Sequence, residues 1–345
     1  MPDVKLPEEV RKADFLYVGT ATGAEAKLVP DAGVPFRTIA AGALRGQGVL
    51  KTLRSLFLLA RGTISAVSIF MGWSPDAVLV SGGYVAAPVL LAAKLTGTPA
   101  MIYLPDITPG ATIKYLSRLV KRVAITAQET LDYFPQKGVV TGYPVRMDFY
   151  RMNREVAREA LGLPDDKPTV VVLGGSQGAR SINKAIVDSL PEILKYAHVI
   201  HATGERDIQW VQKEREKLPE ELRSGYEPAA YLTNMPQVMV AADLAVCRAG
   251  ASTLGELPAA GLPAILVPYP YAGAHQKANA QYLAGRSAAV IVEDDELDSM
   301  LLPMLLSLLN NPERLASMRI SMRKLSRQGA AITIARELWS LAEEG

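Results

Sequence analysis

The sequence predicts an α/β protein built from two doubly wound domains, each a parallel sheet with helices on both faces. Short runs rich in Val, Ile and Leu alternate with segments of helix length along the whole chain. Uninterrupted apolar runs of this kind are typical of strands buried on both faces of a parallel sheet. The helix-length segments supply the crossovers that parallel strands require. The 345 residues are enough for two domains of ordinary size.

The predicted strands fall into two groups, separated by a stretch rich in turn residues. Four lie in the first half of the chain, at residues 15–18, 77–80, 100–103 and 123–126. Five lie in the second half, at residues 169–173, 198–201, 244–247, 264–267 and 289–292. Between the groups come Gly142-Tyr143-Pro144 and Leu163-Pro164-Asp165-Asp166. We therefore predict a first domain over residues 1–147, a second over 148–330, and a C-terminal helix over 331–345 that packs back toward the first.

Composition excludes several classes of protein. Lys plus Arg number 37 and Asp plus Glu 35, so a net charge of +2 gives no reason to expect nucleic acid. The single cysteine, Cys247, cannot form an internal disulfide, and three scattered histidines do not suggest a zinc site. No uninterrupted run of about 18 apolar residues occurs, and the N-terminus lacks the apolar core of a signal peptide. We therefore expect a cytoplasmic protein with no spanning helix, no metal and no cofactor.

A glycine-rich turn follows the predicted strand at residues 169–173. It reads Leu173-Gly174-Gly175-Ser176-Gln177-Gly178-Ala179-Arg180. Glycine lets backbone N–H groups approach a phosphate, and the N-terminus of the next helix adds a favourable dipole. The lysine of a P-loop is absent, so the turn is not of the Walker type. A tight strand–helix turn without a ligand remains the alternative.

A second loop follows the predicted strand at residues 244–247 and reads Arg248-Ala249-Gly250-Ala251-Ser252-Thr253-Leu254-Gly255-Glu256. Gly250 permits a tight turn, and Ser252 or Thr253 can cap a helix whose first N–H groups face an anion. Arg248 could pair with a diphosphate. Glu256 comes one helical turn after Ser252, where its carboxylate could accept both hydroxyls of a ribose. The alternative for Glu256 is a solvated helix residue.

A third segment follows the predicted strand at residues 264–267. It contains Pro268-Tyr269-Pro270-Tyr271 and then His275-Gln276-Lys277-Ala278-Asn279-Ala280. Gln276 and Asn279 are three residues apart on a predicted helix, so both amides can face one ligand. Amides suit sugar hydroxyls, which need donors and acceptors together. A structural role remains the alternative for His275.

In this order and spacing the three motifs resemble the donor domain of the MurG family of GT-B glycosyltransferases. The resemblance covers nearly the whole chain, and it implies two Rossmann-like domains with an interdomain cleft. Further matching segments are His201-Ala202-Thr203-Gly204, Tyr231-Leu232-Thr233-Asn234-Met235, Tyr17-Val18-Gly19-Thr20, Glu25-Ala26-Lys27-Leu28-Val29-Pro30, Leu44-Arg45-Gly46, Ser81-Gly82-Gly83-Tyr84-Val85 and Gly142-Tyr143-Pro144-Val145-Arg146.

The resemblance implies an inverting enzyme of peptidoglycan synthesis. In this family the 4-hydroxyl of a lipid-linked N-acetylmuramyl-pentapeptide attacks the anomeric carbon of UDP-N-acetylglucosamine, which converts lipid I to lipid II. The implied partners are UDP-N-acetylglucosamine, the lipid-linked acceptor and an anionic membrane surface. A UDP-sugar transferase with another acceptor, and a catalytically impaired UDP-sugar-binding relative, remain alternatives.

The family's binding roles carry over to the matching positions, most of them on the donor side and one on the acceptor side. The implied residues are Arg146 and Ser176 near the diphosphate or sugar, Tyr231 and Leu232 at the uracil, Arg248, Ala251, Ser252 and Thr253 around the diphosphate, Glu256 at the ribose, His275, Gln276 and Asn279 near the N-acetylglucosamine, and Tyr84 on the acceptor side.

The chain departs from the family pattern in its first half. The family opens with a strand and a Gly-Gly-Thr-Gly-Gly-His loop whose histidine is a candidate base, and no such sequence occurs here. We expect a start assigned too late, or a fragment, rather than an adapted fold. Tyr103-Leu104-Pro105-Asp106 stands where the family usually has His-Glu-Gln-Asn, and Tyr143 replaces an asparagine. Asp106 is therefore the candidate base and an acceptor-side residue, with a simple turn residue as the alternative.

An apolar segment at residues 49–70 predicts a helix with a broad apolar face and basic companions at Arg45, Lys51, Arg54 and Arg61. A second basic group comprises Lys114, Arg118, Lys121 and Arg122. Such a surface could rest on anionic lipid, which predicts peripheral association with the cytoplasmic face of the cell membrane. An ordinary core helix with one solvated face remains the alternative.

Overall fold

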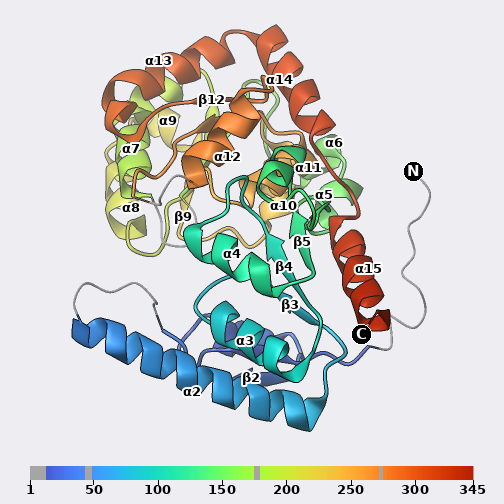
Figure 1. Cartoon of the computed structure of the whole chain (residues 1–345). Helices are drawn as coiled ribbons and strands as arrows, with labels where there is room; N and C mark the ends of the chain where they lie inside the picture. The colour runs from blue at the N-terminus through green and yellow to red at the C-terminus, as the bar shows by residue number, and fades with distance from the viewer. Residues whose placement is uncertain (1–12, 43–48, 175–178, 272–274, 345) are drawn as a thin grey trace. The chain divides into compact units, whose positions relative to one another are not determined.

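The structure is a computed structural model of the 345-residue chain, and it describes residues 13–42, 49–174, 179–271 and 275–344, without the side chains of residues 49–52 (Figure 1). The chain divides into two compact units. The first comprises Met1–Pro105, Pro109–Gly142 and Gly329–Gly345, and the second comprises Asp106–Thr108 and Tyr143–Gln328. Each unit is built on parallel strands with intervening helices, which confirms the predicted fold class.

The strands of the first unit form two separate parallel sheets, β1-β2 and β3-β4-β5-β6. Their bounds are β1 (Tyr17–Gly19), β2 (Phe36–Thr38), β3 (Val78–Val80), β4 (Ala100–Leu104), β5 (Arg122–Ile125) and β6 (Gly138–Val140). Among the described residues, no strand pairs with the second edge of β1 or of β3. The sequence predicted β1, β3, β4 and β5 but not β2 and β6, because the two latter strands are short and contain no buried residue.

The helices of this unit include one at the far end of the sequence. Their bounds are α1 (Glu25–Asp31), α2 (Val49–Trp73), α3 (Ala86–Thr96), α4 (Ala111–Leu116), η2 (Ser117–Leu119), η3 (Gln128–Tyr133) and α15 (Ala330–Glu343). Arg122 at the start of β5 holds α15, because its guanidinium pairs with Glu337 at 2.8 Å and also with Glu344. Arg122 was therefore wrongly assigned to a lipid-facing basic group, since its charge is used within the unit.

Helix α2 lies against α3 and presents two different faces (Figure 1). Ala66 and Phe70 are buried on the inner face, whereas Phe57 is 64% and Ile64 71% exposed on the outer one. Leu53–Trp73 is long and apolar enough to cross a membrane by length and composition alone. The sequence prediction missed this because it counted only uninterrupted apolar runs, and Arg54 and Arg61 interrupt this one. The packing of α2 on α3 shows a helix with one covered face, and the absence of a spanning helix stays a prediction.

The second unit contains one six-stranded parallel sheet in the order β12-β11-β10-β7-β8-β9. The strands are β7 (Thr169–Leu173), β8 (His198–Ala202), β9 (Tyr226–Ala229), β10 (Leu244–Cys247), β11 (Ala264–Leu266) and β12 (Ala289–Ile291). Val170 and Val172 pack in one core with α7 and α13, while Val171, fully buried, points to the other face. Burial on both faces explains the uninterrupted apolar sequence of β7. Only β9 was not predicted, because Glu227 and Pro228 interrupt its apolar pattern.

Helices cover both faces of this sheet. Their bounds are α5 (Asp148–Arg151), α6 (Arg154–Ala160), α7 (Arg180–Ile193), α8 (Ile208–Glu216), α9 (Glu220–Arg223), α10 (Met235–Ala241), α11 (Thr253–Ala260), α12 (His275–Ala284), η4 (Asp294–Glu296), α13 (Leu297–Leu309) and α14 (Pro312–Lys324). Helices α7, α11 and α12 follow the neighbouring strands β7, β10 and β11. The turns that precede these three helices therefore start at the carboxyl edge of the sheet.

Gly62 allows α2 to approach the rest of the first unit closely. A Cβ atom at this position would lie 2.2 Å from the backbone oxygen of Ala40 and 3.2 Å from Cβ of Pro88. We expect Gly62→Ala to destabilise the first unit by about 1–3 kcal/mol, the usual cost of overpacking. Gly72→Ala is the matched control, because no atom lies within 4 Å of a Cβ there. Hydrogen exchange of the α2 and α3 amides measures both, and an equal loss in the two variants would contradict the steric explanation.

Candidate functional site

The candidate site of the second unit is built at the carboxyl edge of its sheet. Strands β7, β10 and β11 end level with one another, since Cys247 pairs with Leu173 on one side and with Leu266 on the other. The three motifs found in the sequence begin directly after these strand ends. Parallel topology therefore brings together segments that lie far apart in the sequence.

The loop after β10 is held by its own polar groups. The Thr253 hydroxyl donates to the backbone oxygen of Gly250 at 2.6 Å, and α11 starts at Thr253. Neither Ser252 nor Thr253 caps α11 through its side chain, so the predicted capping role is wrong. The Ser252 hydroxyl instead donates to the Glu256 carboxylate one turn later. The first backbone N–H groups of α11 donate to carbonyl oxygens of the preceding turn, Thr253 to Gly250 at 3.0 Å and Leu254 to Ala251 at 3.1 Å.

Arg248 is engaged inside the unit. Its guanidinium lies 2.5 Å from Asp294 Oδ1 and 2.7 Å from Ser181 Oγ, and it stacks 5.2 Å from the ring centroid of Tyr269. The Ser181 hydroxyl also donates to Asp294 at 2.7 Å. Arg248 therefore ties the loop after β10 to α7 and η4, and Asp294 balances its charge. A contact with a diphosphate stays a prediction for this residue.

Glu256 and Tyr143 are half-buried, and the exposed Arg146 acts on the Glu256 carboxylate through its charge. Burial raises the pKa of Glu256, while the Arg146 charge and the Ser252 hydroxyl oppose that shift. The pKa of Tyr143 is raised by burial, and further by the negative charges of Glu256 and Asp106. These interactions place Asp106 and Glu256 near the same phenol, although they lie far apart in the sequence.

Gly255 makes room for that phenol. A Cβ atom on Gly255 would lie 2.5 Å from Cδ1 of Tyr143 and 2.7 Å from Cγ2 of Val145. Helix α11 therefore packs directly on the segment 143–145 through a residue without a side chain. The sequence prediction named Gly255 only as part of a motif and gave it no function.

The third motif does not present its two amides to one open face. Asn279 is fully buried, and it contacts Asp106, Ile107 and Ala249. Gln276 is half-buried, and its Oε1 accepts from the backbone N–H of Tyr269 at 2.9 Å. Thus the Asn279 amide forms hydrogen bonds inside the unit, and the Gln276 amide forms one with the loop that follows β11.

The remaining predicted positions differ in how far the structure describes them. Tyr231 is 68% exposed and Leu232 is half-buried, while Ala251 belongs to the loop before α11. Tyr84 in the first unit is exposed beside Gly82 and Gly83, which have φ angles of 109° and 75°. Ser176 and the segment Leu44-Arg45-Gly46 lie outside the described residues.

Within the described ranges, no three His, Cys, Asp or Glu side chains are grouped so that they could hold a metal ion.

A buried polar chain, which the sequence prediction missed, runs beneath the start of α7. The Tyr226 hydroxyl lies 2.8 Å from Nδ1 of His201, and Nε2 of His201 lies 3.0 Å from Oδ1 of Asn183. The Asn183 amide donates to Asp207 at 2.9 Å, and Asp207 pairs with Arg180 at 2.9 Å. These hydrogen-bonded side chains fix Arg180, the first residue of α7, relative to β8. A signal was present in the sequence, because Asn183 interrupts the apolar face of a predicted helix.

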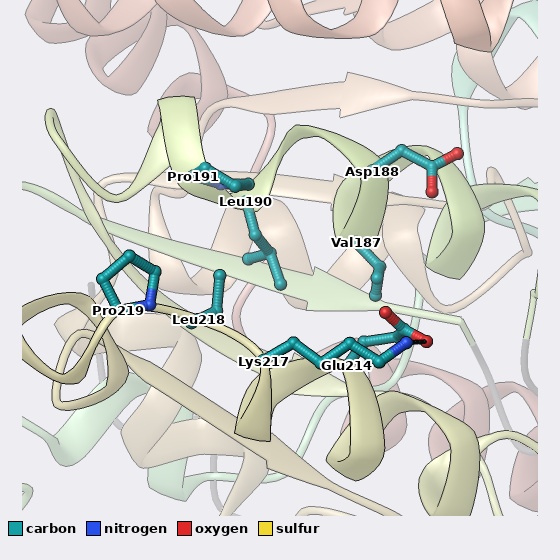
Figure 2. A pocket seen from close by; sticks show the side chains of 8 residues that line it. All are labelled: Val187, Asp188, Leu190, Pro191, Glu214, Lys217, Leu218 and Pro219. Carbon is teal, nitrogen blue, oxygen red and sulfur yellow. Dashed lines mark hydrogen bonds and ion pairs between the residues drawn. The ribbon is translucent and has the colours of Figure 1, made fainter.

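A surface hollow of the second unit lies elsewhere. It has a volume of about 240 Å³, and it is bounded by the C-terminal half of α7 and by the end of α8 with the residues that follow it (Figure 2). Its lining residues are Val187, Asp188, Leu190, Pro191, Glu214, Lys217, Leu218 and Pro219. None of them belongs to the three motifs, so the hollow is not part of the candidate site.

Known proteins match both halves of this chain. The glycosyltransferase family 28 N-terminal domain matches residues 3–125, and the glycosyltransferase family 28 C-terminal domain matches residues 169–333. A protein of Roseiflexus sp. (strain RS-1) is 41% identical over 93% of this chain and 82% of its own, and it is named UDP-N-acetylglucosamine--N-acetylmuramyl-(pentapeptide) pyrophosphoryl-undecaprenol N-acetylglucosamine transferase. A protein of the same name from Desulforudis audaxviator (strain MP104C) is 37% identical over 100% of this chain and 95% of its own. The crystal structure of Acinetobacter baumannii MurG has a TM-score of 0.77 at 28% identity, and covers 96% of this chain and 92% of its own.

His201 makes the stability of the second unit depend on pH. Burial lowers the pKa of His201 from 6.5 to about 3, so the unfolded chain takes up a proton before the folded one does. Stability should therefore fall as the pH falls below 6.5, by about 2 kcal/mol between pH 7 and pH 5. We expect His201→Gln to remove this part of the pH dependence, while His198→Gln, with a partly exposed ring, retains it. Hydrogen exchange of the β7 and β8 amides at both pH values measures the effect; equal slopes for the wild type and His201→Gln would contradict it.

Proposed function

This chain belongs to glycosyltransferase family 28, and from that premise we propose that it moves N-acetylglucosamine from UDP-N-acetylglucosamine to the 4-hydroxyl of a lipid-linked N-acetylmuramyl-pentapeptide. The step converts lipid I to lipid II in peptidoglycan synthesis. The observation that carries the proposal is 41% identity over 93% of the chain with a relative that is named for this reaction. The second unit takes the UDP-sugar in this proposal, and the first unit serves the acceptor and the membrane.

The donor is proposed to bind at the carboxyl edge of the six-stranded sheet. The N-terminus of α7 supplies N–H groups for the diphosphate, the N-terminus of α11 adds its positive dipole end, and Arg146 is the nearby cation. The Glu256 carboxylate accepts hydrogen bonds from the ribose hydroxyls, and Tyr231 and Leu232 take the uracil. The half-buried setting of Glu256 supports this role, because a carboxylate in partly desolvated surroundings binds hydroxyls more strongly than one in water.

The reaction is proposed as a single displacement with inversion. The acceptor hydroxyl forms a bond to the anomeric carbon while the bond to UDP breaks, and the electron pair leaves with the diphosphate oxygen. The helix N-termini stabilise that oxygen, and a base takes the hydroxyl proton. Asp106 is the proposed base, since its negative charge, like that of Glu256, raises the pKa of Tyr143.

The first unit is proposed to rest on the membrane through the outer face of α2. Large apolar side chains of this helix are more than half exposed, and they lie at helical spacing with the exposed Arg54 and Arg61 among them. They include Leu53, Leu56, Phe57 and Ile64. Exposed Lys114, Arg118 and Lys121 provide further cationic groups in the same unit. An apolar face with basic companions fits peripheral binding to anionic lipid at the cytoplasmic face of the cell membrane.

Removal of the Glu256 carboxylate tests the donor site. We expect Glu256→Ala to weaken the binding of UDP-N-acetylglucosamine by about 1–3 kcal/mol, because hydrogen bonds to a charged acceptor are lost. Glu256→Gln should have a smaller effect, since an amide oxygen still accepts one bond. Glu220→Ala on the exposed surface of α9 is the matched control. Calorimetry measures all three, and an unchanged affinity of Glu256→Ala would remove Glu256 from the site.

Sedimentation with anionic vesicles tests the membrane surface. We expect the wild type to pellet at low salt and less at high salt, because exposed charges are screened. Phe57→Ser with Ile64→Ser should weaken binding about tenfold or more, since each lost apolar side chain contributes about 1.5–3 kcal/mol when fully buried. Ile320→Ser, which removes an exposed apolar side chain from α14, should have no effect. The proposal fails if the double variant and this control pellet alike.

A further inference from the structure

Asn279 connects two segments that belong to different parts of the sequence. Its Oδ1 accepts from the backbone N–H of Ile107 at 3.0 Å. Its amide nitrogen donates one hydrogen to Asp106 Oδ1 at 2.8 Å and the other to the backbone oxygen of Ala249 at 3.1 Å. Both amide hydrogens and one oxygen lone pair are thus used, and the side chain is fully buried. No donor of this amide is left to bind a ligand.

His275 holds the same segment from the start of α12. Its Nδ1 lies 2.9 Å from the backbone oxygen of Thr108. A carbonyl oxygen can only accept, so Nδ1 carries the proton in this contact. His275 and Asn279 are four residues apart on one face of the helix. Together they contact three consecutive residues, Asp106–Thr108, and make them part of the second unit.

The contact with Ala249 gives this arrangement a consequence for the site. Ala249 is fully buried at the start of the loop that leads to α11 and Glu256. The Asn279 amide nitrogen therefore bridges the Asp106 carboxylate and that loop, and it sets the distance between them. The shared effect of Asp106 and Glu256 on Tyr143 places both carboxylates on this side of the unit.

We propose that Asn279 and His275 are positioning residues that form a latch on Asp106–Thr108 and set the Asp106 carboxylate against the loop that follows β10. The inference rests on the proposed function, and it replaces the expectation that Asn279 binds the sugar. An amide is required at position 279, because only an amide offers one acceptor and two donors in this plane. An aspartate there would face Asp106 with a second carboxylate, and it would offer no hydrogen to Ala249.

A cycle of two substitutions tests whether the side chains of Asp106 and Asn279 act on each other. Asn279→Asp should destabilise the second unit strongly. Asp106→Asn should have a small effect, because its new amide oxygen still accepts from Asn279. The double variant Asn279→Asp/Asp106→Asn should recover a large part of the loss, since the amide at position 106 then donates to the carboxylate at position 279. Denaturant midpoints measure the cycle, and additive effects would overturn the latch.

Binding and turnover separate a latch from a sugar ligand. Asn279→Asp should leave the ratio of the Kd for UDP to the Kd for UDP-N-acetylglucosamine within about twofold of the wild type, while kcat at saturating donor falls about tenfold or more. A ratio that falls by more than about twofold would show that Asn279 binds the sugar, because only the Kd for the UDP-sugar would rise, and it would overturn the proposal. Asn153→Asp is the matched control, because Asn153 caps α6 through its Oδ1 and a carboxylate can do the same.

A second variant keeps the test decisive if Asn279→Asp does not fold. His275→Ala removes one contact of the latch from a half-buried position, and it should also lower kcat without changing the ratio of the two Kd values. An unchanged kcat in this variant would contradict the role of His275. If the wild type binds no UDP-N-acetylglucosamine, the proposed function fails, whereas the stability cycle still decides whether the latch exists.

Discussion

Hydrogen bonding between β7 and its parallel neighbours is the constraint on which the second unit depends. The strands β7, β10 and β11 are buried on both faces, so their backbone groups must pair with one another until the strands end. Because these strands are parallel and end level, the segments that follow them all start at one edge of the sheet. The glycine turn, the loop that carries Gly250 and the segment before α12 all start there. The position of the candidate site thus follows from the pairing of the sheet.

Hydrogen bonds between polar side chains then fix the loops and helix starts that follow these strands. Burial of a polar group costs free energy unless it is hydrogen-bonded. The unit meets this condition with connected groups, such as the chain from Tyr226 to Asp207 beneath α7. Arg248, Asp294 and Ser181 do the same beside the loop after β10. A fully satisfied group of this kind holds each helix start in one position, which is the preorganisation that phosphate binding by helix N-termini requires.

The sequence predicted where the chain turns but not what each polar side chain contacts. Apolar periodicity reports burial, so most strands were predicted, and the strands that were missed, such as β9, have interrupted or exposed patterns. Periodicity says nothing about the partner of a charge. Arg122 was predicted to belong to a basic surface, but it forms an ion pair with Glu337. Asn279 was predicted to bind the sugar, but it donates a hydrogen bond to Asp106. These partners lie 215 and 173 residues away in the sequence, which no local pattern can reveal.

Two of the departures from the family pattern, Asp106 and Tyr143, illustrate the same limit. In the sequence they are separate changes, an acid and a phenol at positions where the family usually has amides. In the folded unit both act at one place, because the Asp106 and Glu256 charges add to the effect of burial in raising the pKa of Tyr143. A carboxylate added near Glu256 increases repulsion between like charges, and a neighbouring phenol can offset this because it can donate a hydrogen bond where a carboxylate can only accept. The acid and the phenol therefore influence each other electrostatically in the folded unit, and Asn279 holds the acid by a hydrogen bond to its carboxylate.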